Sequence, residues 1–182
     1  LDLIRDRFSI CSVRVPFTSV EYNQHTELRN EYRKMLAITG MSSSQVEYRA
    51  KRGDKYALYI LKKWSGMAKL RHHATNKIPA IKQIVKAEHD KKIIIFSESI
   101  DFAETLGVEI GAIVVHSKLS KKEVLSRLEK FRNSKNGILV APRMIDEGYD
   151  VPDANVAIVA SFRRSIRQMV QRDGRILRTK EF

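Results

Sequence analysis

A short run near the end of the chain has residue types suited to handling phosphate. It reads Gln171-Arg172-Asp173-Gly174-Arg175-Ile176-Leu177-Arg178 and follows an apolar segment. Arg175 and Arg178 are three residues apart, so on a helix they share one face, about one turn apart. Guanidinium groups stay charged and fit phosphate oxygens, so a rigidly held pair can stabilise charge developing on a transferring phosphoryl group. The alternative is an ordinary basic helix end, where arginines complement the helix dipole.

The charge balance favours a polyanionic partner. The 182 residues include 34 Lys and Arg against 21 Asp and Glu, which gives a net charge of +13 and a pI near 10.0. Nucleic acid is the first candidate for such a chain. An acidic membrane surface is less well supported, because we find no polybasic amphipathic helix or lipidation motif.

The remaining composition favours a location inside the cell. No apolar run is long enough to span a membrane, and no signal peptide is recognisable. Cys11 is the single cysteine and cannot form an internal disulfide, which fits a reducing compartment. We therefore expect an intracellular protein, in the cytoplasm or in the nucleoid or nucleus, with no metal site of its own. The first residue is Leu1 rather than Met, so we expect a fragment of a larger protein.

The second half of the chain alternates buried strands with amphipathic helices. Continuous apolar runs predict strands buried on both faces at Ile93–Phe96, Ala112–Val115, Ile138–Ala141 and Val156–Ala160. Helices are predicted to start at Asn76 with Pro79 in the first turn, at Ser99 with an end at Gly107, at the capping box Ser120–Glu123 and at the box Ser165–Gln168. This order predicts an α/β fold, a parallel sheet with helices on both faces.

The preceding residues read as a mainly helical segment. We expect a connector strand at residues 12–17, a helix from Thr18 or Ser19 to about Ile38, a loop at residues 40–44 and a helix over roughly residues 54–73. In the first helix the apolar stripe is Leu28, Tyr32, Met35 and Leu36, and in the second it is Leu58, Leu61, Trp64, Met67 and Ala68. The second stripe predicts that Trp64 packs in a core rather than stacking on a base. We therefore divide the chain at residues 1–75 and 76–182.

Four polar clusters follow the ends of the predicted strands. They are Ser97–Ser99, His116–Lys118, Pro142–Asp150 and Ser161–Ser165. Ligands of open α/β sheets bind off the carboxyl ends of the strands, so this fold would gather the clusters at one edge. Hydroxyl and basic side chains there can hold phosphate oxygens. Taken singly, each cluster also fits a plain strand-to-helix loop with a capping serine.

The chain lacks the loop that would cradle a triphosphate. None of its glycines is followed by lysine, so there is no G-x-x-x-x-G-K-[ST] motif. The pair Asp146-Glu147 resembles a magnesium-binding acidic motif, but without that loop two acids in a connector fit a turn equally well. The residues therefore describe half of a phosphoryl-transfer site.

Residues 76–182 resemble the second RecA-like domain of superfamily-two helicases and translocases. Ile93–Ser97 looks like the strand entering motif four, Gly137–Pro152 like motif five, and Gln171–Arg178 like motif six in its Q-R-x-G-R-x-x-R form. Motif five followed at this distance by motif six is highly specific. The residues before this domain are similar to those that precede it in XPB-like DNA helicases.

The resemblance implies roles in a split nucleotide site. Arg175 and Arg178 would be arginine fingers that reach the γ-phosphate, and Gln171 would contact that phosphate or the acidic motif of the partner domain. The nucleotide-facing turn would contain Glu147, Gly148 and Asp150. ATP with Mg²⁺ would be held mainly by a missing N-terminal RecA-like domain.

The resemblance also implies a groove for nucleic acid. The residues along it would be Ser97, His116, Ser117 and Arg143. Pro142 departs from the family, because many relatives have Thr or Ser there. Proline has neither a hydroxyl nor an N–H group, so that phosphate contact must be lost or moved.

The implied function is the C-terminal motor domain of an ATP-dependent DNA helicase or translocase, inactive as a fragment. Two alternatives stay open. A non-catalytic nucleic-acid-binding α/β module would need only the basic surface, although it would have no reason to keep Gln171 with the arginine pair. An RNA helicase domain differs only in substrate, and the sequence has no signature for the 2′-hydroxyl group.

Overall fold

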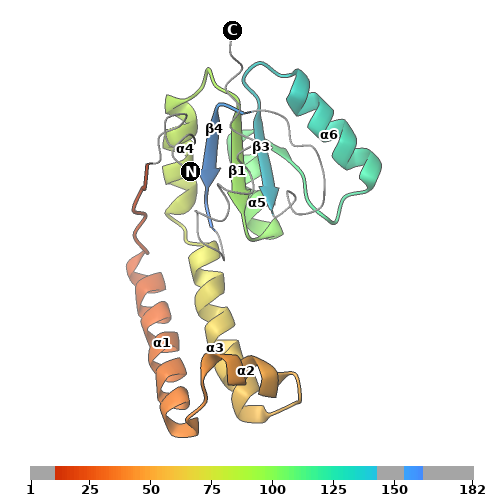
Figure 1. Ribbon diagram of the computed structural model, residues 1–182. Helices are drawn as coiled ribbons and strands as arrows, with labels where there is room; N and C mark the ends of the chain where they lie inside the picture. The colour runs from red at the N-terminus through yellow and green to blue at the C-terminus, as the bar shows by residue number, and fades with distance from the viewer. Residues whose placement is uncertain (1–10, 143–153, 162–182) are drawn as a thin grey trace, which may run out of the picture. The chain divides into compact units, whose positions relative to one another are not determined.

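A computed structural model of the protein describes residues 11–142 and 154–161 (Figure 1). The chain divides into two compact units. Pro16–Asn76 form one, the helical unit, and the described residues of Leu1–Val15 and Lys77–Phe182 form the other, the α/β unit. None of the helices in the described ranges is long and apolar enough to cross a membrane.

The α/β unit is built on a parallel sheet of four strands. They are β1 (Ile93–Ser97), β2 (Ile113–Val114), β3 (Ile138–Pro142) and β4 (Val156–Val159), in the order β2-β3-β1-β4. Every neighbouring pair is parallel. The predicted parallel sheet is confirmed, and each strand begins and ends within one residue of its predicted bounds.

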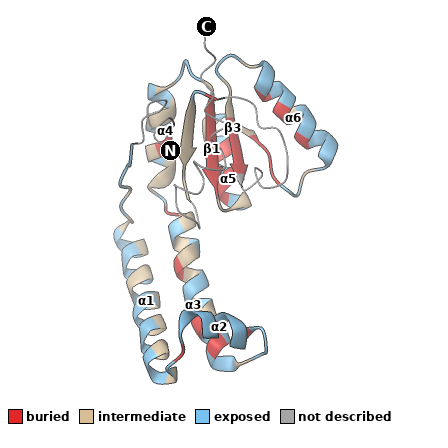
Figure 2. Ribbon diagram, viewed as in Figure 1, coloured by how far each residue is buried: buried red, intermediate tan, exposed pale blue. Residues whose placement is uncertain are grey.

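Helices cover both faces of this sheet, as predicted. Side chains alternate along a strand, so Ile94 and Phe96 face α6 (Lys121–Asn133), where Phe131 completes the core. On the other face, Ile93 and Ile95 pack against α4 (Lys77–Ala87) and α5 (Ile100–Ile110). Figure 2 shows β1 and β3 as the buried centre of the unit. Their continuous burial explains why both strands consist of uninterrupted apolar residues.

Helix α5 does not end at Gly107, the residue predicted to end it. It continues past Gly107 to Ile110, and Gly111 in the left-handed conformation (φ +65°) forms its C-cap. Gly107 is buried inside the helix, and a Cβ atom added there would lie 2.1 Å from Cγ2 of Val114. The prediction was wrong because this glycine permits close approach of α5 to β2 rather than ending the helix.

The helical unit has a small core of its own. Its helices are α1 (Ser19–Thr39), α2 (Ser43–Ala50) and α3 (Lys55–His72). The core consists of Met41, Val46, Ala50, Ala57 and Ile60. Tyr32, Met35 and Leu36 of the predicted α1 stripe pack against it. Thr18 caps α1 through a capping box with Glu21, in agreement with the predicted start.

Helix α2 was not predicted. Its N-cap is Ser42, whose side chain accepts from the Gln45 N–H while the Gln45 side chain accepts from the Ser42 N–H. The expected loop at residues 40–44 is therefore shorter than predicted. The Ser-x-x-Gln spacing of the capping box was the signal in the sequence.

Two predictions for this part of the chain are wrong. Trp64 is 49% exposed and lies beside the Tyr32 ring and the Arg71 guanidinium. Ala57 and Ile60, together with Met67 of the predicted stripe, form the buried face of α3. The connector strand at residues 12–17 does not form. The carbonyl of Pro16 accepts a hydrogen bond from the Asn76 side chain at 2.9 Å rather than from a neighbouring strand.

Candidate functional site

The carboxyl ends of the four strands lie at one edge of the sheet, because all four are parallel. We call this the strand-end edge and define it by Ser97, His116, Pro142 and Ser161, which end or follow the four strands. Ser97 lies opposite Pro142 in the register of β1 and β3. The N–H of Glu98 donates to the Ser161 hydroxyl at 3.1 Å, which joins the ends of β1 and β4. The fold therefore brings the described residues of the predicted polar clusters to one edge, whereas residues 143–150 and 162–165 of those clusters lie outside the described residues.

Ser97 is buried at this edge and its hydroxyl is used within the unit. The side chain is 3% exposed, and its hydroxyl donates to the carbonyl of Ser99 at 2.9 Å. The Ser99 hydroxyl in turn accepts from the N–H of Phe102 and caps α5. Ser97 therefore shapes the turn from β1 into α5. Its contact with nucleic acid stays a prediction.

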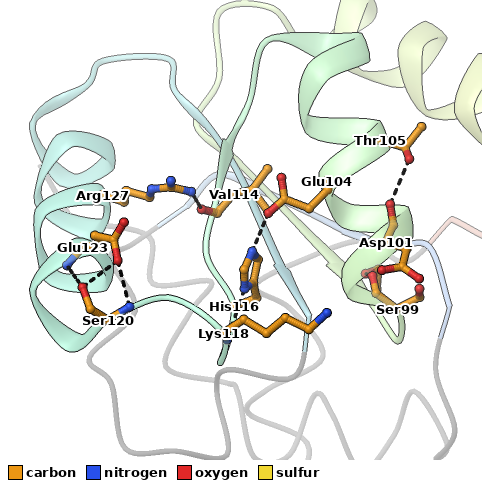
Figure 3. Close-up of polar contacts among 11 residues, drawn as sticks. Ser99, Asp101, Glu104, Thr105, Val114, His116, Lys118, Ser120, Glu123 and Arg127 are labelled. Atoms are coloured by element: carbon orange, nitrogen blue, oxygen red, sulfur yellow. Dashed lines mark hydrogen bonds and ion pairs between the residues drawn. The ribbon is translucent and has the colours of Figure 1, made fainter.

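His116 is also buried, and both of its ring nitrogens have partners (Figure 3). Nε2 lies within hydrogen-bond distance of the Glu104 carboxylate on α5. Nδ1 accepts from the backbone N–H of Lys118 at 3.3 Å. Ser117 and Lys118 are exposed beside it. The structure thus places a buried histidine beneath two exposed polar residues, and the predicted groove contacts of His116 and Ser117 stay predictions.

The start of α6 is capped by its own residues. The N–H and hydroxyl of Ser120 both donate to Oε2 of Glu123, at 2.9 and 2.6 Å, and the Glu123 N–H donates back to the Ser120 hydroxyl. The Ser120 side chain, with help from its backbone, lowers the pKa of Glu123. Arg127 of the same helix donates to the carbonyl of Val114 at 2.6 Å and holds the end of β2.

The other predicted site residues lie outside the described residues. They are Arg143, Glu147, Gly148, Asp150, Gln171, Arg175 and Arg178. Residues 143–150 directly follow β3, whose last residue is Pro142. Their proposed roles, and those of the arginine pair, stay predictions. Within the ranges that are described, no cluster of three or more His, Cys, Asp or Glu could hold a metal ion.

Sequence reasoning missed two residues that shape this edge, Glu104 and Arg127. Glu104 is an exposed residue of α5, and its partner His116 follows β2. The two meet only because the chain turns back from α5 into β2. Arg127 contacts a backbone carbonyl, which any residue type provides. No helical or strand periodicity encodes such pairs. The predicted capping box at Ser120–Glu123 could be found because its spacing is local.

A basic surface lies on helix α3 of the helical unit. Lys55, Lys62 and Lys69 follow one another at intervals of seven residues along α3, which is about 10.5 Å per interval on an α-helix. All three are exposed, and none forms an ion pair with a carboxylate of the described residues. Lys63 differs, because it pairs with Glu31 of α1. The three lysines therefore form a row of uncompensated positive charge, which we call the lysine row.

The parallel four-stranded sheet, with helices on both faces and polar residues at its strand ends, is the architecture of a RecA-like domain. Residues 76–180 match the helicase conserved C-terminal domain, and the chain belongs to this family. The motif-based resemblance is thereby confirmed for residues 76–180.

Two curated relatives match different lengths of this chain. It is 29% identical over 180 residues to the DNA 3′-5′ translocase XPB2 of Sulfurisphaera tokodaii, which covers 96% of this chain and 41% of that protein. It is 31% identical over 105 residues to the DNA 3′-5′ helicase XPB of Mycobacterium tuberculosis, which covers 57% of this chain and 19% of that protein. The chain thus spans less than half the length of these relatives.

A solved structure shares the fold. The C-terminal domain of a Sulfolobus solfataricus SWI2/SNF2 ATPase superposes with a TM-score of 0.62 at 16% sequence identity, covering 82% of this chain and 70% of that chain. The identity is low, so the likeness supports the RecA-like fold alone.

Proposed function

We propose that this chain is the C-terminal motor domain of an ATP-dependent DNA helicase or translocase. The observation that carries the proposal is the match of residues 76–180 to the helicase conserved C-terminal domain, on a parallel sheet that aligns its polar strand ends. Two relatives described as a DNA translocase and a DNA helicase support DNA over RNA as the substrate. The net charge of +13 fits a polyanionic partner.

The nucleotide site would be shared between two domains. The chain has no phosphate-cradling loop, so ATP with Mg²⁺ would be held mainly by an N-terminal RecA-like domain. Arg175 and Arg178 would reach the γ-phosphate when the two domains close, and Gln171 would contact the same phosphate or the acidic motif of the partner. Hydrolysis would supply the energy for reopening. The arginines would stabilise charge that grows as the phosphoryl group leaves.

Nucleic acid would be gripped at two places in this chain. At the strand-end edge, Ser117 and Lys118 are exposed and can bind phosphate oxygens, and Arg143 follows the neighbouring strand. On the helical unit, the lysine row offers three exposed ammonium groups along one helix face. Alternating grip during domain opening and closing would move the strand.

The arginine-finger role is tested in the protein that contains both RecA-like domains. We expect Arg175→Ala to lower the ATPase rate by about 10³-fold or more while DNA affinity is kept. Arg175→Lys should also be slow, because lysine keeps the charge but not the planar fork. An unchanged rate in Arg175→Ala would reject the finger role.

The present chain alone provides a second test. We expect it to hydrolyse no ATP and to bind DNA weakly, with affinity that falls steeply as salt is raised. Sustained ATP turnover by this chain alone would contradict the split site.

A further inference from the structure

We propose that Glu104 and His116 are positioning residues that shape the loop between β2 and α6 for contact with a nucleic-acid phosphate. The part of the loop concerned comprises residues 116–119, and the proposal rests on the proposed function. Neither side chain would touch the phosphate. They would act through Ser117 and Lys118, which the loop presents at the strand-end edge.

The His116 ring is held from two sides. Nδ1 accepts from the Lys118 N–H, so it has no proton, and the proton of the neutral ring is therefore on Nε2. Nε2 faces the Glu104 carboxylate, which accepts that proton as a hydrogen bond. The carbonyl of His116 accepts from the Leu119 N–H at 3.1 Å. One residue thus fixes the backbone at two further positions of its own loop and ties the loop to α5.

Burial separates the supporting residue from the contacting ones. His116 is 5% exposed, whereas Ser117 and Lys118 are exposed. A buried imidazole with both nitrogens engaged cannot reach a phosphate group without breaking these bonds. The Ser117 hydroxyl and the Lys118 ammonium group can reach one without any rearrangement of the loop.

The two ends of the loop are anchored independently. Arg127 holds the carbonyl of Val114 before it, and the Ser120–Glu123 capping box fixes the first turn of α6 after it. The N–H groups of Lys118 and Leu119 are occupied by His116. The loop is therefore ordered before any ligand arrives, and binding avoids the entropy cost of ordering it. If the His116 ring lost its contacts with Lys118 and Glu104, nucleic-acid binding would have to order the loop and would be weaker.

Two substitutions separate the two contacts of the ring. His116→Asn places an amide oxygen near the position of Nδ1 and keeps an acceptor for the Lys118 N–H, but it loses Glu104. His116→Gln places an amide group near the position of Nε2 and keeps a donor toward Glu104, but it loses the acceptor for Lys118. Glu104→Ala removes the partner of His116 Nε2, and because the Glu104 side chain is 49% exposed, its removal leaves no buried cavity.

The experiment measures DNA-stimulated ATPase activity in the protein with both RecA-like domains. We expect His116→Gln to raise the half-saturating DNA concentration by about tenfold, the scale of one lost hydrogen bond, with kcat unchanged at saturating DNA. His116→Asn should raise it less. Glu104→Ala should raise it by a few-fold, whereas Glu109→Ala, which removes an exposed carboxylate of the same helix, should leave it unchanged.

A double-mutant cycle distinguishes positioning from mere stability. In a Lys118→Ala background the phosphate contact is already reduced, so His116→Gln should change the half-saturating DNA concentration less than in the wild-type background. An equal effect in both backgrounds, or no effect of either His116→Gln or Glu104→Ala, would overturn the proposal. If His116→Gln does not fold, the half-saturating DNA concentration of Glu104→Ala tests the proposal in its place. If DNA did not stimulate the ATPase activity of the wild-type protein, that result would instead overturn the proposed function, and this inference with it.

Discussion

Thr75 donates both its backbone N–H and its hydroxyl to the same carboxylate oxygen of Glu21, 54 residues earlier, at 2.8 Å each. The other oxygen of Glu21 accepts from the N–H and the hydroxyl of Thr18, at 2.9 and 3.0 Å. One carboxylate therefore completes the capping box of α1 and joins the start of the helical unit to its end. Its ionised form is the one that accepts all four bonds.

Glu21 should make the stability of the helical unit sensitive to acid. Burial raises its pKa, but the hydrogen bonds from Thr18 and Thr75 outweigh this and lower the pKa from 4.5 to about 2. Because the folded pKa is lower than the unfolded one, this stabilisation is present above about pH 4.5 and is lost as the pH falls toward about 2. We expect Glu21→Gln to lower the free energy of unfolding at neutral pH and to flatten its decline over that window. Urea denaturation at a series of pH values checks this.

The matched control is Glu27→Gln, which removes an exposed carboxylate from the same helix. It should leave the pH profile close to that of the wild type. If Glu21→Gln and the wild type had the same profile, the four hydrogen bonds would contribute no net stability.

Gly107→Ala should destabilise the α/β unit although alanine favours helices. The added Cβ atom would lie 2.1 Å from Cγ2 of Val114, so α5 and β2 must separate or Val114 must leave its rotamer. Such overpacking costs about 1–3 kcal/mol, which exceeds the gain of up to about 1 kcal/mol from helix propensity. Urea denaturation measures the difference. Val114→Ala in the same chain should recover part of the loss.

Gly66→Ala in α3 provides the comparison. There the nearest atom to the added Cβ is Leu28 Cδ1 at 3.1 Å, the end of a flexible side chain. We expect a smaller loss than for Gly107→Ala. Equal losses at the two glycines would mean that the close approach to Val114 is relieved by a small shift.

Ser120→Ala should destabilise α6 by about 1 kcal/mol, because it removes the side-chain cap on the Glu123 N–H. Ser120→Asp should keep most of the stability, since aspartate is an equally good N-cap residue. Ser126→Ala, at an exposed position inside the same helix, controls for helix propensity and should not destabilise. Thermal or urea denaturation checks all three. A loss in Ser126→Ala as large as in Ser120→Ala would contradict the capping role.

The lysine row should contribute measurably to DNA binding. Replacing Lys55, Lys62 and Lys69 together by Gln should weaken binding to duplex DNA. If each lysine contacts a phosphate, the slope of log affinity against log salt should fall by about 2.7, or about 0.9 per contact. Fluorescence anisotropy titrations at several salt concentrations measure that slope.

The control for this variant removes three lysines that already have carboxylate partners. They are Lys63, Lys82 and Lys91. Both variants lose the same net charge, so a difference in slope reports on direct contacts. Identical slopes for the two variants would show that only overall charge matters.

The strands were the most predictable part of the fold. Runs such as Ile93-Ile94-Ile95-Phe96 can be buried on both faces only in a covered parallel sheet, and each predicted strand agrees with the structure within one residue. Helix α5 was less predictable, because a glycine can end a helix or let it approach a neighbour. The choice at Gly107 depends on Val114, which the sequence alone does not place.

The candidate site was predictable only where its residues have fixed spacing. The capping box at Ser120–Glu123 could be recognised from its interval of three residues, whereas the role of the arginine motif stays a prediction. The contact between Glu104 and His116 joins helix α5 to the loop that follows β2. No regular spacing along the sequence predicts such a contact. Trp64 was misplaced because two adjacent stripes of α3 are both apolar, and tertiary packing selected the one with Ala57 and Ile60.

The first and last residues of the helical unit, Pro16 and Asn76, are hydrogen-bonded to each other at 2.9 Å. A stretch of chain whose two ends meet can be lengthened, shortened or exchanged while the flanking residues keep their positions. We therefore expect residues 16–76 to tolerate insertions and deletions. Because Pro16 and Asn76 are hydrogen-bonded to each other, a different helical hairpin could also be grafted between these two residues.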